Sequence, residues 1–157
     1  MRVLVGGVGY RFLRDASIGP WVTERLAPRA SDDVEVEDLS YHPIGFIHNL
    51  QERPPYDRLV LIGALNRGRP PGTVDSYRWD GVLPPAEEIQ ARVSEAVTGV
   101  ISLDNLLIVS AALGELPGDV RVVEVEPADE GWGEGFSPVI EEKLSEVVET
   151  TWTLTAP

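Results

Sequence analysis

Short apolar runs alternate along the chain with longer segments in which apolar residues recur every three or four positions. The run Val3–Val5 is closed by glycines, and a second run lies between Arg58 and Gly63. A short apolar run between turn residues is typical of a strand buried in a parallel sheet. Three further strands are predicted, at 34–36 and 73–79, where polar and apolar residues alternate as at a sheet edge, and at 120–125.

Helices are predicted between these strands. The segments 18–26 and 44–50 each carry a one-sided apolar pattern. After Pro84 and Pro85, a helix is expected to bury one face, and another follows from Leu103 to Leu113, with Ser102 or Asp104 as its N-cap. The pair Ser137-Pro138 predicts an N-cap and first turn for a C-terminal helix. The inner faces are expected to hold Ile89, Val93, Ala96 and Val97 in the first case, and Ile140, Leu144, Val147 and Val148 in the last.

This alternation predicts an α/β fold, a mostly parallel sheet with helices on both faces, formed by residues 1–157 as one domain. Binding sites in such folds lie at the carboxyl ends of the strands. The loops 6–19, 63–72 and 126–137 are therefore expected to lie close together.

Composition narrows the classes of function. The formal net charge is −13, with only 13 Lys and Arg residues, which argues against binding to nucleic acid or to anionic membranes. The chain has no cysteine, so disulfides, thiolate metal sites and cysteine nucleophiles are excluded. No segment is long and apolar enough for a signal peptide or a membrane span, and we expect a cytoplasmic protein.

The glycine-rich loop "GGVGYRFLRDASIG" does not fit the common catalytic motifs. Gly7 and Gly9 are followed by Tyr10, Arg11 and Phe12, so the third glycine of a dinucleotide-binding loop is absent. No phosphate-binding Gly-Lys-Ser/Thr and no serine-hydrolase G-x-S-x-G occurs anywhere. A small-ligand site built from the glycine loops remains open on geometry alone.

Other candidate side chains are few. The two histidines, His42 and His48, do not have the spacing of a helical metal pair. Trp132 stands between glycines after a strand, where it would either close the end of the sheet or contact a partner.

Four stretches of the chain resemble the hydrogenase maturation proteases, the endopeptidases that remove the C-terminal tail of a nickel-iron hydrogenase large subunit. They are "LVGGVGYRFLRDASIG", "YDRLVLIGALNRGRPPGTV", "LGELPGDVRVVEVEP" and "WGEGFSPVI". The resemblance implies a three-layer α/β/α sandwich and a metal site that recognises bound nickel.

The implied metal ligands are absent from the matching positions. The second acidic position of the first loop is Ala16, beside Asp15, and the aspartate of the second motif is Gly63. The window Thr98–Ser102, which includes Gly99, holds no histidine. In the first loop, Tyr10 replaces the family's asparagine and Arg14 its glycine. Alanine and glycine side chains offer no lone pair, so the sequence predicts neither a metal site of the family type nor a cofactor.

Two functions follow from this resemblance. The chain either binds a hydrogenase large subunit, or a similar client, as an assembly factor without nickel recognition, or it cleaves that subunit through a rearranged site. The expected client surface is the loop rim with Tyr10, Arg11, Arg14, Arg67, Arg69 and Trp132. A rearranged catalytic site would combine Asp15 and Asp104 with His48 or His42.

Overall fold

The computed structural model describes all residues, 1–157, and is built around one five-stranded sheet. The strands are β1 (Val3–Val8), β2 (Val34–Asp38), β3 (Arg58–Ala64), β4 (Val74–Arg78) and β5 (Asp119–Val125), in the spatial order β2-β1-β3-β5-β4. All neighbours are parallel except β4, which runs antiparallel to β5. The predicted strands, with β3 central and β2 and β4 at the edges, are confirmed.

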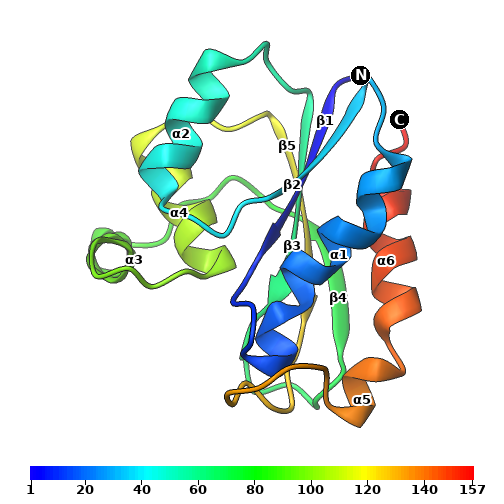
Figure 1. Cartoon of the computed structure of the whole chain (residues 1–157). Coiled ribbons are helices and arrows are strands. Elements are labelled where there is room, and N and C mark those ends of the chain that lie inside the picture. The colour runs from blue at the N-terminus through cyan, green and yellow to red at the C-terminus, as the bar shows by residue number, and fades with distance from the viewer.

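Helices cover both faces of the sheet, which Figure 1 shows nearly edge-on. One layer contains α1 (Ile18–Leu26), α5 (Pro138–Glu141) and α6 (Leu144–Thr153), and the other contains α2 (Pro43–Glu52), α3 (Ala86–Val97) and α4 (Leu103–Leu113). Two short 3-10 helices, η1 (Arg14–Ser17) and η2 (Ala27–Arg29), flank α1. The expected three-layer α/β/α sandwich is confirmed. No helix is long and apolar enough to cross a membrane.

The sheet separates two hydrophobic cores, because successive strand residues point to opposite faces. Leu59 and Leu61 of β3 pack toward Phe46 and Leu106 on the α2 and α4 side. On the other face, Val60 and Ile62 pack with α1, α5 and α6. β3 is thus buried on both faces, as its continuous apolar run predicts.

Two helix predictions need correction. The C-terminal helix is interrupted, giving α5 and α6. Ser137 and Pro138 are confirmed as the N-cap and first-turn residues of α5, but the Ser137 hydroxyl donates to Asp15 and makes no capping bond. Of the α3 residues expected to be buried, only Ala96 is buried, and Val97 is 73% exposed. The reason is that α3 projects from the molecule and packs mainly against α4. Ser102 is confirmed as the N-cap of α4, since it accepts a hydrogen bond from Asn105 N at 3.0 Å.

Candidate functional site

The loops that follow β1, β3 and β5 meet at the carboxyl edge of the sheet. Arg67 N, in the loop after β3, donates to Glu126 Oε1 at 2.9 Å, just after β5. Ser137 N, at the end of the loop after β5, donates to Asp15 Oδ1 at 2.8 Å. The predicted convergence of these three loops is confirmed.

The glycines of the first loop serve packing of the chain on itself. A Cβ on Gly7 would lie 2.1 Å from the carbonyl oxygen of Gly19, and one on Gly19 would lie 2.4 Å from that of Val8. No real Cβ tolerates such distances, so α1 can approach β1 only because glycine stands at both positions. This explanation accounts for these glycines without a ligand.

Asp15 is the centre of the contact between the first and last loops. Its side chain is 1% exposed and accepts hydrogen bonds from Ala128 N, Asp129 N and Ser137 N at 2.8 to 2.9 Å, and from Ser137 Oγ at 2.7 Å. Burial alone would raise the pKa of Asp15, but the hydroxyl and backbone donors outweigh it and lower that pKa below its ordinary value. We call this group the Asp15 anchor. It is a charged structural tie between segments far apart in sequence.

The backbone beside the anchor is held in an unusual conformation. Phe12 and Arg14 have φ angles of 68° and 44°, in the left-handed region that disfavours side chains with a Cβ. Each such residue costs about 1 to 3 kcal/mol, which the surroundings must offset. Phe12 O accepts from Gly133 N at 2.7 Å, and Arg14 N donates to Gly133 O at 3.2 Å, so the last loop holds the first in this shape. Arg14 occupies the position at which the resemblance places a glycine.

An exposed aromatic pair projects from the same two loops. Phe12 is 52% and Trp132 81% exposed, and their ring centroids lie 6.4 Å apart. Trp132 therefore does not close the end of the sheet. Its backbone neighbour Gly133 is fixed by the hydrogen bonds above, so the pair is presented on an ordered support. Aromatic side chains exposed in this way are favoured at protein interfaces.

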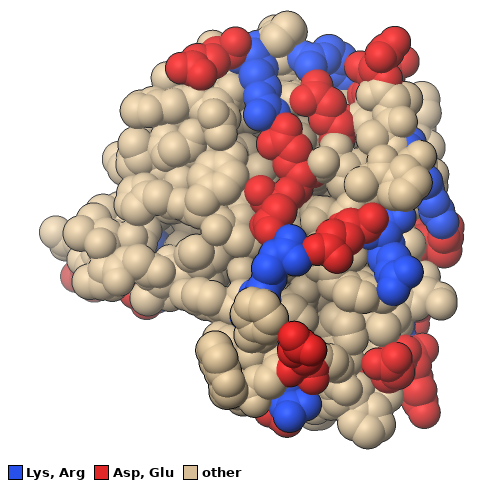
Figure 2. All heavy atoms as spheres, viewed as in Figure 1, with Lys and Arg blue, Asp and Glu red and all other residues tan.

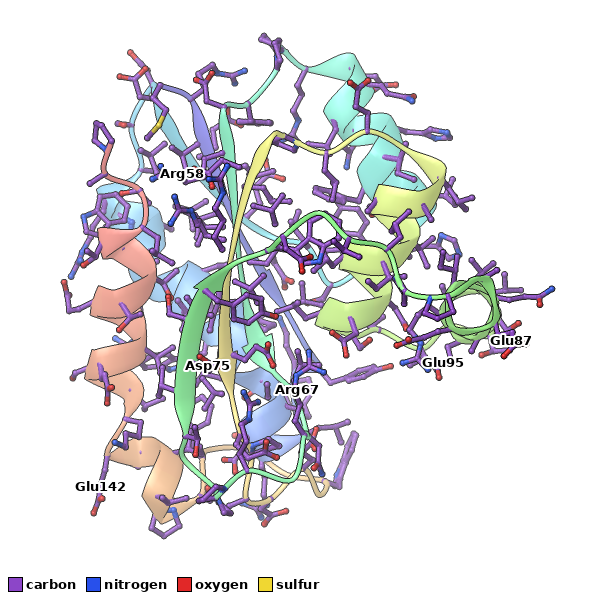
Figure 3. The ribbon with its side chains drawn as sticks, turned by 180° about the vertical axis from the view of Figure 1, so that it is seen from behind. Arg58, Arg67, Asp75, Glu87, Glu95 and Glu142 are labelled. Carbon is purple, nitrogen blue, oxygen red and sulfur yellow. The ribbon has the colours of Figure 1, made fainter.

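Two buried carboxylates end β5, and two arginines cover them. Glu124 and Glu126 are each 2% exposed. Arg67 pairs through Nε with Glu124 and through Nη2 with Asp104 at 2.8 Å, while Arg69 Nε lies 2.9 Å from Glu126 Oε1. Burial would raise the pKa of Glu126, but the Arg67 backbone N–H and the Arg69 guanidinium outweigh it and lower that pKa. Figure 3 shows Arg67 at this end of the sheet.

The arginines expected to bind a client are thus already paired within the chain. Besides Arg67 and Arg69, Arg11 pairs with Glu24 at 2.5 Å and Asp38 at 3.3 Å, and Arg14 Nε lies 3.6 Å from Asp129. Figure 2 shows acidic and basic side chains side by side down the middle of one face. A client would have to compete with internal carboxylates for these groups.

The three family ligand positions do not fit a metal. Ala16 is buried and carries only a methyl group, and Gly99, at φ 89°, has no neighbour near its missing Cβ. A Cβ on Gly63 would lie 2.8 Å from Val8 O and 3.3 Å from the Leu103 side chain. No group of three or more His, Asp or Glu side chains is suitably placed elsewhere. The donor set that a nickel or zinc ion requires is missing.

Tyr10 instead joins the first loop to the segment expected to carry the histidine. Its phenol oxygen accepts a hydrogen bond from Ile101 N at 2.7 Å. Ile101 lies in the Thr98–Ser102 window, so a side chain of the first loop spans the distance between two of the ligand positions. The tyrosine predicted to bind a client has an internal partner.

The alternative catalytic residues are not brought together. Asp15 is buried in its anchor, and Asp104 pairs with Arg67. His48 is exposed on α2, and His42 caps the same helix by accepting from Ile44 N at 3.1 Å. No hydrogen bond or ion pair joins a carboxylate of this set to either histidine.

Sequence reasoning missed Glu124, Glu126 and Phe12. The sequence does contain a signal for the two glutamates. Glu124 and Glu126 are two positions apart at the end of an apolar strand, and Arg67 and Arg69 have the same spacing in the loop that faces them. For Phe12, no local pattern marks an aromatic residue with positive φ.

The chain is similar to several proteins of known structure. No protein-family model matches the sequence, and no curated protein matches it either. Among solved structures, the hydrogenase maturating endopeptidase HybD from E. coli is 26% identical, with a TM-score of 0.74, over 98% of this chain and 91% of that one. An endopeptidase from E. coli is also 26% identical, with a TM-score of 0.70, over 96% of this chain and 89% of that one.

A more distant match extends the likeness in fold. The [NiFe] hydrogenase maturation protease HybD from Thermococcus kodakarensis has a TM-score of 0.68 over 99% of this chain and 100% of that one, at 18% identity, which shows the fold alone. The E. coli structures, at higher identity over nearly the full length, carry the relationship. Over nearly its full length, the chain is similar in fold and in part of its sequence to hydrogenase maturation endopeptidases.

Proposed function

We propose that this chain acts in the maturation of a nickel-iron hydrogenase large subunit, or of a similar client, as a binding or assembly factor without nickel recognition. The observation that carries the proposal is a contrast within one site. The first and last loops are tied together by the Asp15 anchor, whereas Ala16, Gly63 and Gly99 supply no metal ligand.

The client surface in this proposal is the aromatic pair Phe12 and Trp132. It is exposed, held by the Gly133 backbone, and needs no ion pair to be broken before a partner can bind. Burial of a large aromatic side chain at an interface contributes more than exchange of one ion pair for another. The arginines around the aromatic pair would then orient the bound client.

A pull-down tests this function. The tagged chain is co-expressed in its native host with the hydrogenase, and recovered proteins are identified by mass spectrometry. We expect the large subunit with the unaltered chain and loss of most of it with Trp132→Ala, whose exposed ring can be removed without unfolding the protein. Leu113→Ala, at another exposed apolar position, is the matched control. Failure to recover any hydrogenase subunit contradicts the proposal.

The second candidate, cleavage of the client tail through Asp15, Asp104 and His48, would require rearrangement. The Asp15 carboxylate would have to leave four hydrogen bonds, and Asp104 its pairing with Arg67. The local contacts thus favour binding over cleavage. Shortening of a purified precursor by the chain would reverse this preference.

A further inference from the structure

The outer edge of β4 carries unused backbone hydrogen-bonding groups. Trp79 N donates to Val120 O at 2.8 Å and Glu126 N to Thr73 O at 2.9 Å, so the odd-numbered residues of β4 bond to β5. By alternation, the N–H and C=O groups of Val74, Ser76 and Arg78 point away from the sheet. Nothing in the chain pairs with them. We call these outward-pointing groups of Val74, Ser76 and Arg78 the β4 edge. In Figure 3, β4 is the strand that carries the label of Asp75.

Three arginines gather beside this edge around a single carboxylate. Asp119 accepts from Arg58 Nε and Arg121 Nε at 2.7 Å each, and Arg78 Nε lies 3.3 Å away. We call Arg58, Arg78 and Arg121 the arginine row. Figure 3 shows Arg58 at the end of the sheet opposite Arg67, so the row is remote from the candidate site.

The arginine row has more positive charge than its partner can neutralise. Three guanidinium groups share one carboxylate, which leaves two positive charges in a chain whose net charge is −13. Arg78 and Arg121 also stand directly opposite each other on β4 and β5, and like charges in that arrangement are destabilising. Arg58 Nη2, Arg121 Nη1 and Arg78 Nη1 have no partner, and the Arg78 side chain is 60% exposed. An incoming anion would relieve the repulsion.

The opposite edge of the sheet is different. β2 carries Glu35, Glu37 and Asp38, and its glutamates pair with Arg2 and Arg53. Added negative charge would be repelled there. The two edges therefore discriminate between ligands by charge.

We propose that the β4 edge and the arginine row bind an extended acidic segment of a protein partner as an additional strand. The segment would hydrogen-bond to Val74, Ser76 and Arg78, which is the geometry of strand addition. A partner residue opposite Arg78 places its side chain on the same face of the sheet. A glutamate or aspartate there would contact Arg78 and extend the alternation of charges. This surface is separate from the client surface proposed above.

The test uses a fluorescein-labelled peptide of alternating Thr and Glu residues and the full chain. Binding is measured by fluorescence anisotropy, and backbone protection by amide hydrogen exchange. We expect binding that protects the amides of Val74, Ser76 and Arg78, and Arg78→Glu to weaken it about tenfold or more, because like charges are then juxtaposed. Arg25→Glu, an exposed arginine on α1, is the matched control and should bind as the unaltered chain does.

A backbone variant separates strand addition from simple charge attraction. The Ser76 N–H makes no bond to β5, so Ser76→Pro should leave the sheet intact while it blocks an added strand. A peptide with Lys in place of Glu should not bind. Binding that persists in Arg78→Glu, that leaves the three amides unprotected, or that is absent at about 1 mM peptide overturns the proposal. So does a dimer of the chain formed through β4, seen as a mass change in light scattering.

Discussion

Asp15 and its neighbour Ala16 stand side by side in the first loop, but only Asp15 carries a side chain with polar contacts. Asp15 is buried and accepts four hydrogen bonds that organise the last loop. Its neighbour Ala16 and the glycines at 63 and 99 offer nothing to a metal. The Asp15 carboxylate supports the fold, whereas the adjacent Ala16 has no group that could bind a metal.

This difference separates two uses of a family framework. A carboxylate that accepts hydrogen bonds from three backbone N–H groups and a hydroxyl is needed for the loop shape whether or not a metal binds. A metal ligand that makes no structural bond is needed only for the metal. The aromatic pair depends on the loop shape alone, so the proposed role in partner binding needs no metal ligand.

The largest expected effect comes from removing the anchor. Asp15→Ala leaves three backbone donors without their buried acceptor and should lower the free energy of unfolding by about 3 kcal/mol. Urea denaturation followed by circular dichroism measures this. Glu134→Gln, on the exposed surface of the last loop, is the control and should change little. Equal stability of Asp15→Ala and the unaltered chain would show that the Asp15 hydrogen bonds do not stabilise the fold.

Restoring a family ligand is expected to cost stability next. In Gly63→Asp, the new Cβ would press on Val8 O and Leu103, and such overpacking costs about 1 to 3 kcal/mol. Gly68→Ala is a control in open space, where only the positive φ opposes the change. Thermal unfolding of the two variants compares these costs. If Gly63→Asp is as stable as the unaltered chain, the position is still shaped for a ligand.

Loss of the Tyr10 hydroxyl should have a smaller effect. Tyr10→Phe deprives Ile101 N of its acceptor and should destabilise the chain by about 1 kcal/mol. Hydrogen exchange at the Ile101 amide is the specific readout, and we expect it to become faster. Unchanged exchange would mean that the bond does not hold the two segments together.

The smallest expected effect is the pH dependence of stability, which separates the contribution of the Asp15 charge from that of its shape. Its pKa is lowered from 3.8 in the folded chain, so its contribution to stability is fully present above that value and is lost as the pH falls through the lowered pKa. The stability difference between the unaltered chain and Asp15→Asn should therefore shrink in acid. A difference that stays constant with pH would assign the effect to shape alone.

Much of the fold could be predicted from the sequence, because burial on both faces gives β3 a continuous apolar run and an edge position gives β4 alternation. The break between α5 and α6 could not be predicted. Ser137 has the local features of an N-cap, but its hydroxyl serves a carboxylate more than a hundred residues away in sequence.

The site was less predictable, since ion pairs form between residues that only the fold brings together. Arg67 and Arg69 stand out in an acidic sequence and suggest a surface for a partner. Their partners, Glu124 and Glu126, lie at the end of β5, almost sixty residues away, among apolar residues that predict only a buried strand. The resemblance suggested the ligand positions. The aromatic pair depends on hydrogen bonds between two loops at Gly133, which no sequence pattern marks.

The most direct test of the central claim is the mass of a purified, nickel-loaded precursor of the hydrogenase large subunit after incubation with this chain. Binding is followed in the same sample by size-exclusion chromatography. We predict a complex in which the precursor keeps its full mass, and which is lost with Trp132→Ala. A precursor shortened at its C-terminus would contradict the account and show that the chain is an endopeptidase.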